Sequence, residues 1–168
     1  MRKATGDEGE APTYGYLTTV DSAVHGVFGG FLLVDGVGRP LEFHCTTPVK
    51  VSRAQQILYG ATLPAHLHGR QIGATLLAEA GSTPRAVLTD SESLLHVRAH
   101  TDLPVVLVQR GDAGAPGGQV VRFGDASVAL PEQVPPGLVD GLGTLAGAVD
   151  LCEPFERIRA AIDEAQKH

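Results

Sequence analysis

Hydrophobic residues in the first third of the chain occur in short stretches, a pattern typical of β-strands rather than helices. The β-rich stretch 14–20 predicts one strand, and the stretch 27–34 predicts a second. Four apolar residues follow one another at 31–34. Such a run favours a strand covered on both faces, so we expect the second strand to lie inside a sheet.

The third stretch, 40–46, alternates apolar and polar residues, which is the period of a strand buried on one face only. Its connection to the second stretch is short, so the three strands should form an antiparallel meander. We expect its apolar side chains to face the core and its polar side chains to remain uncovered. The apolar set is Leu41, Phe43 and Cys45, and the polar set is Glu42, His44 and Thr46.

Helical signals follow the meander. Ser52 and Gln55 have the spacing of a capping box, in which each side chain bonds to the backbone of the other residue, and they predict a helix over 52–59. Pro64 can open a second helix that continues to about residue 80. Two helical segments are therefore expected after the third strand.

The middle of the chain has the pattern of a βαβ unit. The stretches 84–89 and 104–109 are short and apolar, and a helix is expected between them over 91–99. A strand, helix and strand of these lengths usually form a right-handed unit with parallel strands. We expect the stretch 84–89 also to lie parallel to the first strand.

The last part of the chain predicts a hairpin and two helices. Gly124 and Asp125 can form a tight turn between strands at 119–123 and 126–130. Apolar residues then recur at helical spacing in two segments. The first segment carries Leu138, Leu142, Leu145 and Val149, and the second carries Phe155, Ile158, Ile162 and Ala165.

Composition narrows the class of protein. The chain has 168 residues, which suits one α/β domain over 13–168 after a charged and small-residue tail over 1–12. With 13 Lys and Arg against 19 Asp and Glu, the net charge of −6 disfavours nucleic acid and anionic membranes as partners. Two widely separated cysteines and no apolar leader segment predict a reduced, cytoplasmic protein without a membrane span.

Four short motifs accompany this order of predicted elements. They are Asp21-Ser22 at the end of the first strand, Gly29-Gly30-Phe31 in the second, Thr46-Thr47 before the first helix and Thr89-Asp90-Ser91 after the fourth strand. Together, the order and the motifs resemble the ribonuclease H-like superfamily over about residues 14–110. The fold expected from this resemblance is α/β, with a mixed sheet in which a three-stranded antiparallel meander precedes a βαβ unit.

The resemblance implies catalytic and metal-binding roles for two residues, Asp21 and Asp90. Superfamily carboxylates hold paired divalent metals for phosphodiester hydrolysis, so these two side chains should lie close together. The chain departs from the family at the first helix, where Gln55 or Gln56 stands in place of a glutamate. An amide brings no negative charge to a Mg²⁺ site. The later family acid is open among Asp140, Asp150, Glu153 and Glu156.

Ordinary structural roles are an alternative explanation for these candidate catalytic and metal-binding residues. Asp90 can complement the dipole of the following helix, and Asp21 with Ser22 suits an ordinary turn. Glu92, His96 and His100 recur every four residues, so on an α-helix they would share one face and two could hold a transition metal. A solvated helix face explains the same spacing.

We therefore expect a non-catalytic binding or accessory domain with a degenerate metal site and no cofactor. The alternative is a nuclease that uses Asp21 and Asp90 with Mg²⁺ or Mn²⁺. The expected partner is a protein or a second copy of the chain, and the expected docking face is the polar face of the third strand, Glu42, His44 and Thr46.

Overall fold

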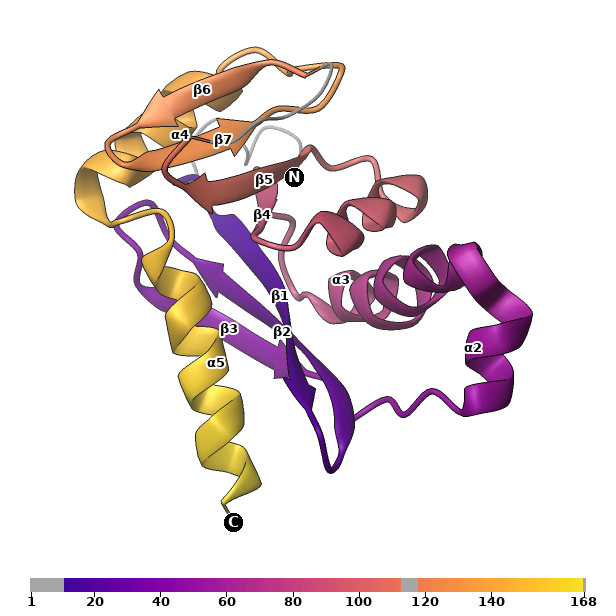
Figure 1. Cartoon of the computed structure of the whole chain (residues 1–168). Helices are drawn as coiled ribbons and strands as arrows, with labels where there is room; N and C mark the ends of the chain where they lie inside the picture. Colours follow the sequence, from indigo (N-terminus) through magenta and orange to yellow (C-terminus); the bar gives the residue numbers. More distant parts are fainter. Residues whose placement is uncertain (1–10, 113–117, 168) are drawn as a thin grey trace.

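A seven-stranded mixed sheet organises the protein, with strand order β3-β2-β1-β4-β5-β7-β6 (Figure 1). The computed structural model describes residues 11–112 and 118–167. Most of the expected tail over 1–12 lies outside these residues. The strands are β1 (Tyr14–Ser22), β2 (Gly26–Val34), β3 (Pro40–Cys45), β4 (Ala86–Thr89), β5 (Val105–Arg110), β6 (Val120–Phe123) and β7 (Ala126–Ala129).

Helices cover both faces of the sheet. α4 and α5 pack on one face, and η2, α3 and η3 pack on the other. The helical segments are α2 (Arg53–Tyr59), η1 (Gly60–Thr62), η2 (Ala65–Ala74), α3 (Thr75–Glu79), η3 (Glu92–His100), α4 (Leu138–Ala148) and α5 (Glu153–Gln166). Figure 1 shows α2 projecting from the body of the molecule, and no residue of α2 is buried.

The strand directions confirm the predicted meander and βαβ unit. β2 pairs antiparallel with both β1 and β3, and β4 pairs parallel with β1 and with β5. The predicted hairpin is also present, because β6 and β7 pair antiparallel around Gly124. The glycine adopts a φ of 63°, which the tight turn requires and which a side chain disfavours. The fold is therefore mixed α/β, as the pattern predicts.

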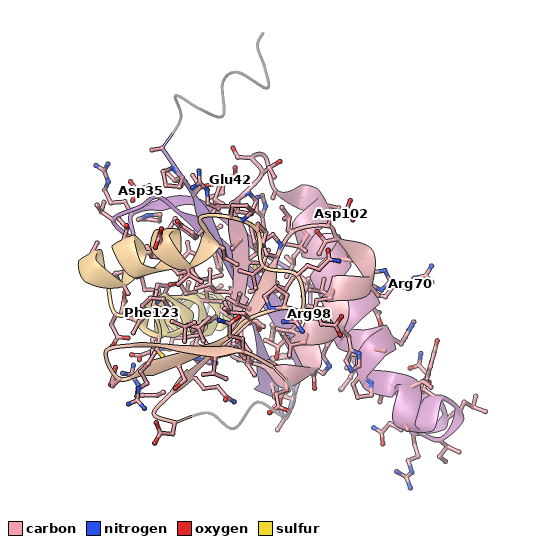
Figure 2. All side chains as sticks on the ribbon, turned by 90° about the horizontal axis from the view of Figure 1, so that it is seen from above. Asp35, Glu42, Arg70, Arg98, Asp102 and Phe123 are labelled. Atoms are coloured by element: carbon pink, nitrogen blue, oxygen red, sulfur yellow. The ribbon has the colours of Figure 1, made fainter. Side chains whose placement is uncertain are left out.

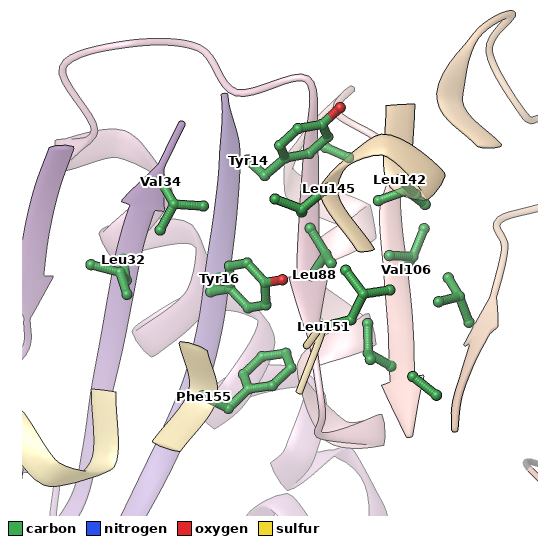
Figure 3. Close-up of a cluster of buried hydrophobic side chains, with 14 of the residues drawn as sticks. Tyr14, Tyr16, Leu32, Val34, Leu88, Val106, Leu142, Leu145, Leu151 and Phe155 are labelled. Atoms are coloured by element: carbon green, nitrogen blue, oxygen red, sulfur yellow. The ribbon is translucent and has the colours of Figure 1, made fainter. Parts of the chain in front are cut away.

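The core face under α4 and α5 carries the largest hydrophobic cluster (Figure 3). The rings of Tyr16 and Phe155 meet edge to face with centroids 4.9 Å apart. Two adjacent glycines of β2 let helices approach from both sides. A Cβ on Gly30 would lie 2.4 Å from Ile158 of α5, and one on Gly29 would lie 2.3 Å from Ile72 of η2. These glycines therefore set the distance between β2 and both helical layers.

The helices differ from their predicted types. The segment 65–74 is a π-helix that continues directly into α3, where a single α-helix is expected. The segment 92–100 is a 3₁₀ helix, and no described side chain caps it at Ser91. The capping box at Ser52 and Gln55 is confirmed, with both reciprocal hydrogen bonds present.

The expected burial of β3 is wrong, because its apolar face is the open one. Leu41 is 52% exposed, Phe43 is 40% exposed and the Cys45 thiol is exposed. Glu42 and His44 are half-buried instead. The cause is the helical layers: α5 packs on β1 and β2 but leaves β3 uncovered, whereas α3 packs on β3 from the other face.

Among residues 11–112 and 118–167, no helix combines the length and the hydropathy needed to cross a bilayer.

Candidate functional site

A threonine and an aspartate meet where β1 and β4 part. Leu17 and Thr89 form the last paired position of these parallel strands, and Thr18 and Asp90 follow them. The Thr18 hydroxyl donates a hydrogen bond of 2.6 Å to the Asp90 Oδ1 atom. Thr18 is only 1% exposed, so this hydroxyl has little access to water as an alternative partner. The hydrogen bond therefore orients the Asp90 carboxylate toward the α5 face of the sheet.

An arginine from α5 completes the site. The Arg159 Nη2 atom donates to the Asp90 Oδ2 atom and lies 3.3 Å from the Thr18 hydroxyl. The position of Arg159 follows from the apolar stripe of α5, since Ile158 and Ile162 are buried against the sheet on either side of it. The Arg159 side chain remains 44% exposed. The guanidinium thus neutralises Asp90 and still faces solvent.

Asp21 lies elsewhere. It pairs with Val27 across the β1–β2 ladder and stands three positions beyond Thr18, the residue bonded to Asp90, or about 10 Å at the usual rise of a strand. Alternation along β1 places Asp21 on the face opposite Thr18, because side chains at odd and even positions point to opposite sides. On that face its charge acts on His68 of η2. The structure therefore does not bring Asp21 and Asp90 together.

The residues around Asp90 do not fit a divalent metal pair. Within the described part of the chain, no group of three or more His, Cys, Asp and Glu side chains could hold a metal ion. Mg²⁺ and Mn²⁺ need several hard anionic oxygens, whereas Asp90 is already engaged by Thr18 and by the Arg159 cation. No metal-dependent step follows from this arrangement.

The amides that stand in place of the family glutamate are also distant from the site. α2 lies at the periphery of the molecule in Figures 1 and 2. The Gln55 side chain accepts a hydrogen bond from the Ser52 backbone, and Gln56 accepts one from Arg53. Both amides therefore serve the helix that carries them.

Residues 92–100 form a 3₁₀ helix, so the four-residue spacing of the histidines does not align their side chains. With three residues per turn, positions four apart diverge by about 120°, so Glu92, His96 and His100 do not share a face. His96 instead lies against Gly69 of η2, where an added Cβ would lie 2.8 Å from the His96 Cβ. The predicted alignment of these three side chains is therefore wrong.

The polar residues expected to dock a partner form internal hydrogen bonds. Glu42 accepts a 2.9 Å bond from the His44 ring and a 2.8 Å bond from the Gly81 backbone. The backbone bond to Gly81 is the main reason that the pKa of Glu42 lies below its usual value, and the bond to His44 adds to it. The Thr46 hydroxyl accepts a 2.9 Å bond from the Gly29 backbone. The polar side chains of this face thus form hydrogen bonds within the chain, to β2 and to the segment after α3.

Two residues of the site, Thr18 and Arg159, are missed by sequence reasoning. Thr18 reads as an ordinary strand residue, and the motif Asp21-Ser22 draws attention away from it. The available signal is register: if β1 and β4 are parallel neighbours, the residue opposite Asp90 must come from the middle of the first strand. Arg159 has a signal too, because it lies within the apolar stripe of the last helix.

The comparisons with known proteins give similarity of fold only. No protein-family model matches the chain, and no curated protein matches it. One similar solved structure is the catalytic domain of human Endonuclease V, with a TM-score of 0.48 and 13% identity over 94% of this chain and 85% of that chain. Ciona intestinalis Endonuclease V, in complex with a DNA containing inosine followed by ribo-adenosine, has a TM-score of 0.45 and 15% identity over 64% of this chain.

A third similar structure is Marinitoga piezophila Argonaute in complex with a 5′ OH guide RNA, with a TM-score of 0.41, 10% identity and coverage of 80% of this chain. The matched region spans 50% of the length of the Ciona protein and 25% of the length of the Argonaute. At these identities and TM-scores the likeness assigns no superfamily to the chain, and what the structure shows is a mixed α/β sheet of seven strands.

The expected partner is corrected by these findings. Two of the three similar structures described above are complexes with DNA or RNA, and neither is described with a protein partner on a corresponding strand. A protein partner or second copy on Glu42, His44 and Thr46 is therefore not proposed further. The likeness itself, at these identities and TM-scores, carries no argument about activity. Function has to come from the side chains of the site.

Proposed function

We propose that this chain is a ribonuclease H-like domain that binds nucleic acid through backbone phosphates and does not cleave it. The observation that supports this proposal is the hydrogen-bonded group of Thr18, Asp90 and Arg159. Two partners hold the Arg159 guanidinium in place, and the side chain is 44% exposed. A guanidinium fixed in this way meets phosphate oxygens in a fork geometry at little further entropic cost.

The same group supports the absence of cleavage. Hydrolysis by paired metals requires converging carboxylates, whereas Asp90 carries an arginine where a metal ion would bind. Nucleic acid enters as the ligand class because proteins of similar fold are described with DNA or RNA, and the test below decides it. Since the net charge is −6, attraction to phosphates must come from local cations such as Arg159.

The test is fluorescence anisotropy of labelled single-stranded and double-stranded DNA and RNA with the whole chain. We expect Arg159→Ala to weaken binding and to reduce the slope of log affinity against log salt by about one, as for a lost phosphate contact. The matched control is Lys167→Ala, which removes one positive charge from the end of the same helix. Equal affinity of the wild type and Arg159→Ala, or no binding of any of the four ligands, would refute the proposal.

A cleavage assay on the same nucleic acids, with Mg²⁺ and then with Mn²⁺, distinguishes a nuclease from the non-cleaving domain proposed here. We expect no cleavage with either metal. Turnover that Asp90→Asn abolishes and that His100→Ala retains would establish the alternative. His100 is exposed on η3 and makes no described contact with Asp90, so it controls for changes unrelated to the site.

A further inference from the structure

A cavity lined by apolar atoms and a few polar side chains lies at the other end of the sheet from Asp90. It has a volume of about 320 Å³ and lies between the start of β1, the residue before β4 and the first turns of α4. Asp90 follows the last residue of β4, whereas this cavity adjoins the first, which Tyr14 pairs with across the sheet. The side chains that give it chemical character are Tyr14, Arg85, Asp140 and Thr144. None of them belongs to the site proposed above.

The Tyr14 hydroxyl is the first sign of a ligand. Tyr14 is only 1% exposed, and its hydroxyl has no hydrogen-bond partner among the described residues. Figure 3 shows this hydroxyl directed away from the hydrophobic cluster. Burial raises the pKa of Tyr14, so the group is a neutral hydrogen-bond donor at neutral pH. A buried hydroxyl with no partner is costly unless a group in the cavity accepts a hydrogen bond from it.

The chain makes room for this hydroxyl with a glycine. A Cβ on Gly141 would lie 2.6 Å from the Tyr14 oxygen, closer than any side chain tolerates. The glycine interrupts α4, where alanine would be the better helix former. The tyrosine and the glycine together keep a donor at the wall of the cavity.

Positive groups converge on the same space. Arg85 is exposed at the cavity and forms no ion pair with any residue in 11–112 or 118–167. α4, with 11 residues, begins there after Gly137, and no described side chain caps its first turn. The Leu138 N–H donates to the Pro135 carbonyl, so the N–H groups that can face a ligand are the next ones of that turn. The first backbone N–H groups of a helix attract anions. Asp140 supplies one carboxylate, which can accept hydrogen bonds from hydroxyl groups of a ligand.

We propose that this cavity binds a small phosphomonoester that also carries hydroxyl groups. Three kinds of donor surround the space: the Arg85 guanidinium, the first turn of α4 and the Tyr14 hydroxyl. Donors from several directions suit a tetrahedral phosphate better than a planar carboxylate. The Asp140 carboxylate then accepts hydrogen bonds from the hydroxyl groups of the ligand. The cavity volume of about 320 Å³ exceeds what a phosphate alone would fill.

Calorimetric titration of the full chain tests this with three probes: glycerol phosphate, inorganic phosphate and glycerate. We expect saturable binding in the order glycerol phosphate, inorganic phosphate, glycerate. Arg85→Ala should weaken the binding of glycerol phosphate about tenfold or more, as for a lost charged hydrogen bond. Asp140→Asn should reduce the advantage of glycerol phosphate over inorganic phosphate. Arg70→Ala, which removes another exposed arginine from η2 on the opposite face of the sheet, should leave all three affinities unchanged.

Tyr14→Phe separates binding from folding. This variant removes a buried hydroxyl that has no partner, so the protein without ligand should be at least as stable as the wild type in thermal unfolding, and its affinity for glycerol phosphate should fall. No saturable binding of either phosphate probe, or tighter binding of glycerate, would overturn the proposal. So would unchanged affinity in both Arg85→Ala and Tyr14→Phe.

Discussion

At the scale of single residues, close contacts between buried groups decide which substitutions the chain tolerates. Tyr14 and Gly141 form such a pair, since the phenol oxygen occupies the space of a missing Cβ. The same Cβ on Gly141 would lie 3.7 Å from the Tyr14 ring carbon that bears the oxygen, which is an ordinary contact distance. The conflict therefore belongs to the hydroxyl alone, and this makes it testable by a double-mutant cycle.

We expect Gly141→Ala to destabilise the wild type and to stabilise the Tyr14→Phe variant. In the variant the clash is gone, and alanine in place of glycine in a helix contributes about 0.5–1 kcal/mol. Urea unfolding of the four proteins measures the coupling. Gly147→Ala is the control, because nothing lies within 4 Å of a Cβ at that position of α4. It should change stability equally in both backgrounds, and the same result for Gly141→Ala would contradict the clash.

The residue scale also shows where sequence reasoning about the site succeeds and fails. Asp90 is correctly placed at the end of a buried strand, since an apolar run followed by Thr-Asp-Ser is a local signal. Its partners are not local. Thr18 is 72 positions away and Arg159 is 69 positions away along the chain. Only strand register and helix docking bring them together, and neither is encoded in a short motif.

At the scale of elements, the directions and neighbours of the first five strands are predictable, whereas the place of the β6–β7 hairpin in the sheet and the covering of each face are not. The alternation in β3 is real, but it does not state which face the helices cover. Here α5 stops at β2, so Leu41 and Phe43 are open and Glu42 is bonded to Gly81. Likewise, the pattern predicts a helix between β4 and β5 but does not state its type, which is 3₁₀ in the structure.

Helix α2 gives a prediction at this scale, because its stability depends on its own cap. No residue of α2 is buried, and Leu58 is 83% exposed. Removing the cap with Ser52→Ala should cost the helix about 1 kcal/mol. We expect faster amide hydrogen exchange at Gln55 and Gln56, with the global free energy of unfolding unchanged in urea.

Ser91→Ala is the matched comparison, because Ser91 precedes η3 without capping it. Exchange in η3 should be the same with serine or alanine there. A loss of global stability in Ser52→Ala would mean that α2 is coupled to the core, contrary to its packing.

At the scale of the whole molecule, the two cores on either side of the sheet unfold together if residues 13–168 form one domain, as we propose. Stability should then respond to groups buried in either layer. One such group is His68 of η2, a half-buried side chain whose Nδ1 atom has no partner among the described residues. Burial lowers the pKa of His68 from its usual 6.5, the charge of Asp21 acts in the opposite direction, and His96 lowers it further.

The sign of the pH dependence follows from this shift. The unfolded chain takes up a proton at His68 near pH 6.5, whereas the folded protein takes it up only at lower pH. Between these two values the unfolded state binds more protons, so the free energy of unfolding decreases as the pH falls through 6.5. The carboxylates of Asp35 and Glu42, whose pKa values are lowered chiefly by backbone hydrogen bonds, add their own loss only at more acidic pH.

Urea unfolding at pH values between about 8 and 5 measures this dependence. We expect the wild type to lose stability on acidification across this range and His68→Gln to lose less, because glutamine does not titrate. His100→Gln replaces an exposed histidine at the end of η3 and should keep the wild-type slope. An identical slope in the wild type and in His68→Gln would show that protons taken up elsewhere control acid stability. Stability that rises on acidification would contradict the burial of a neutral His68.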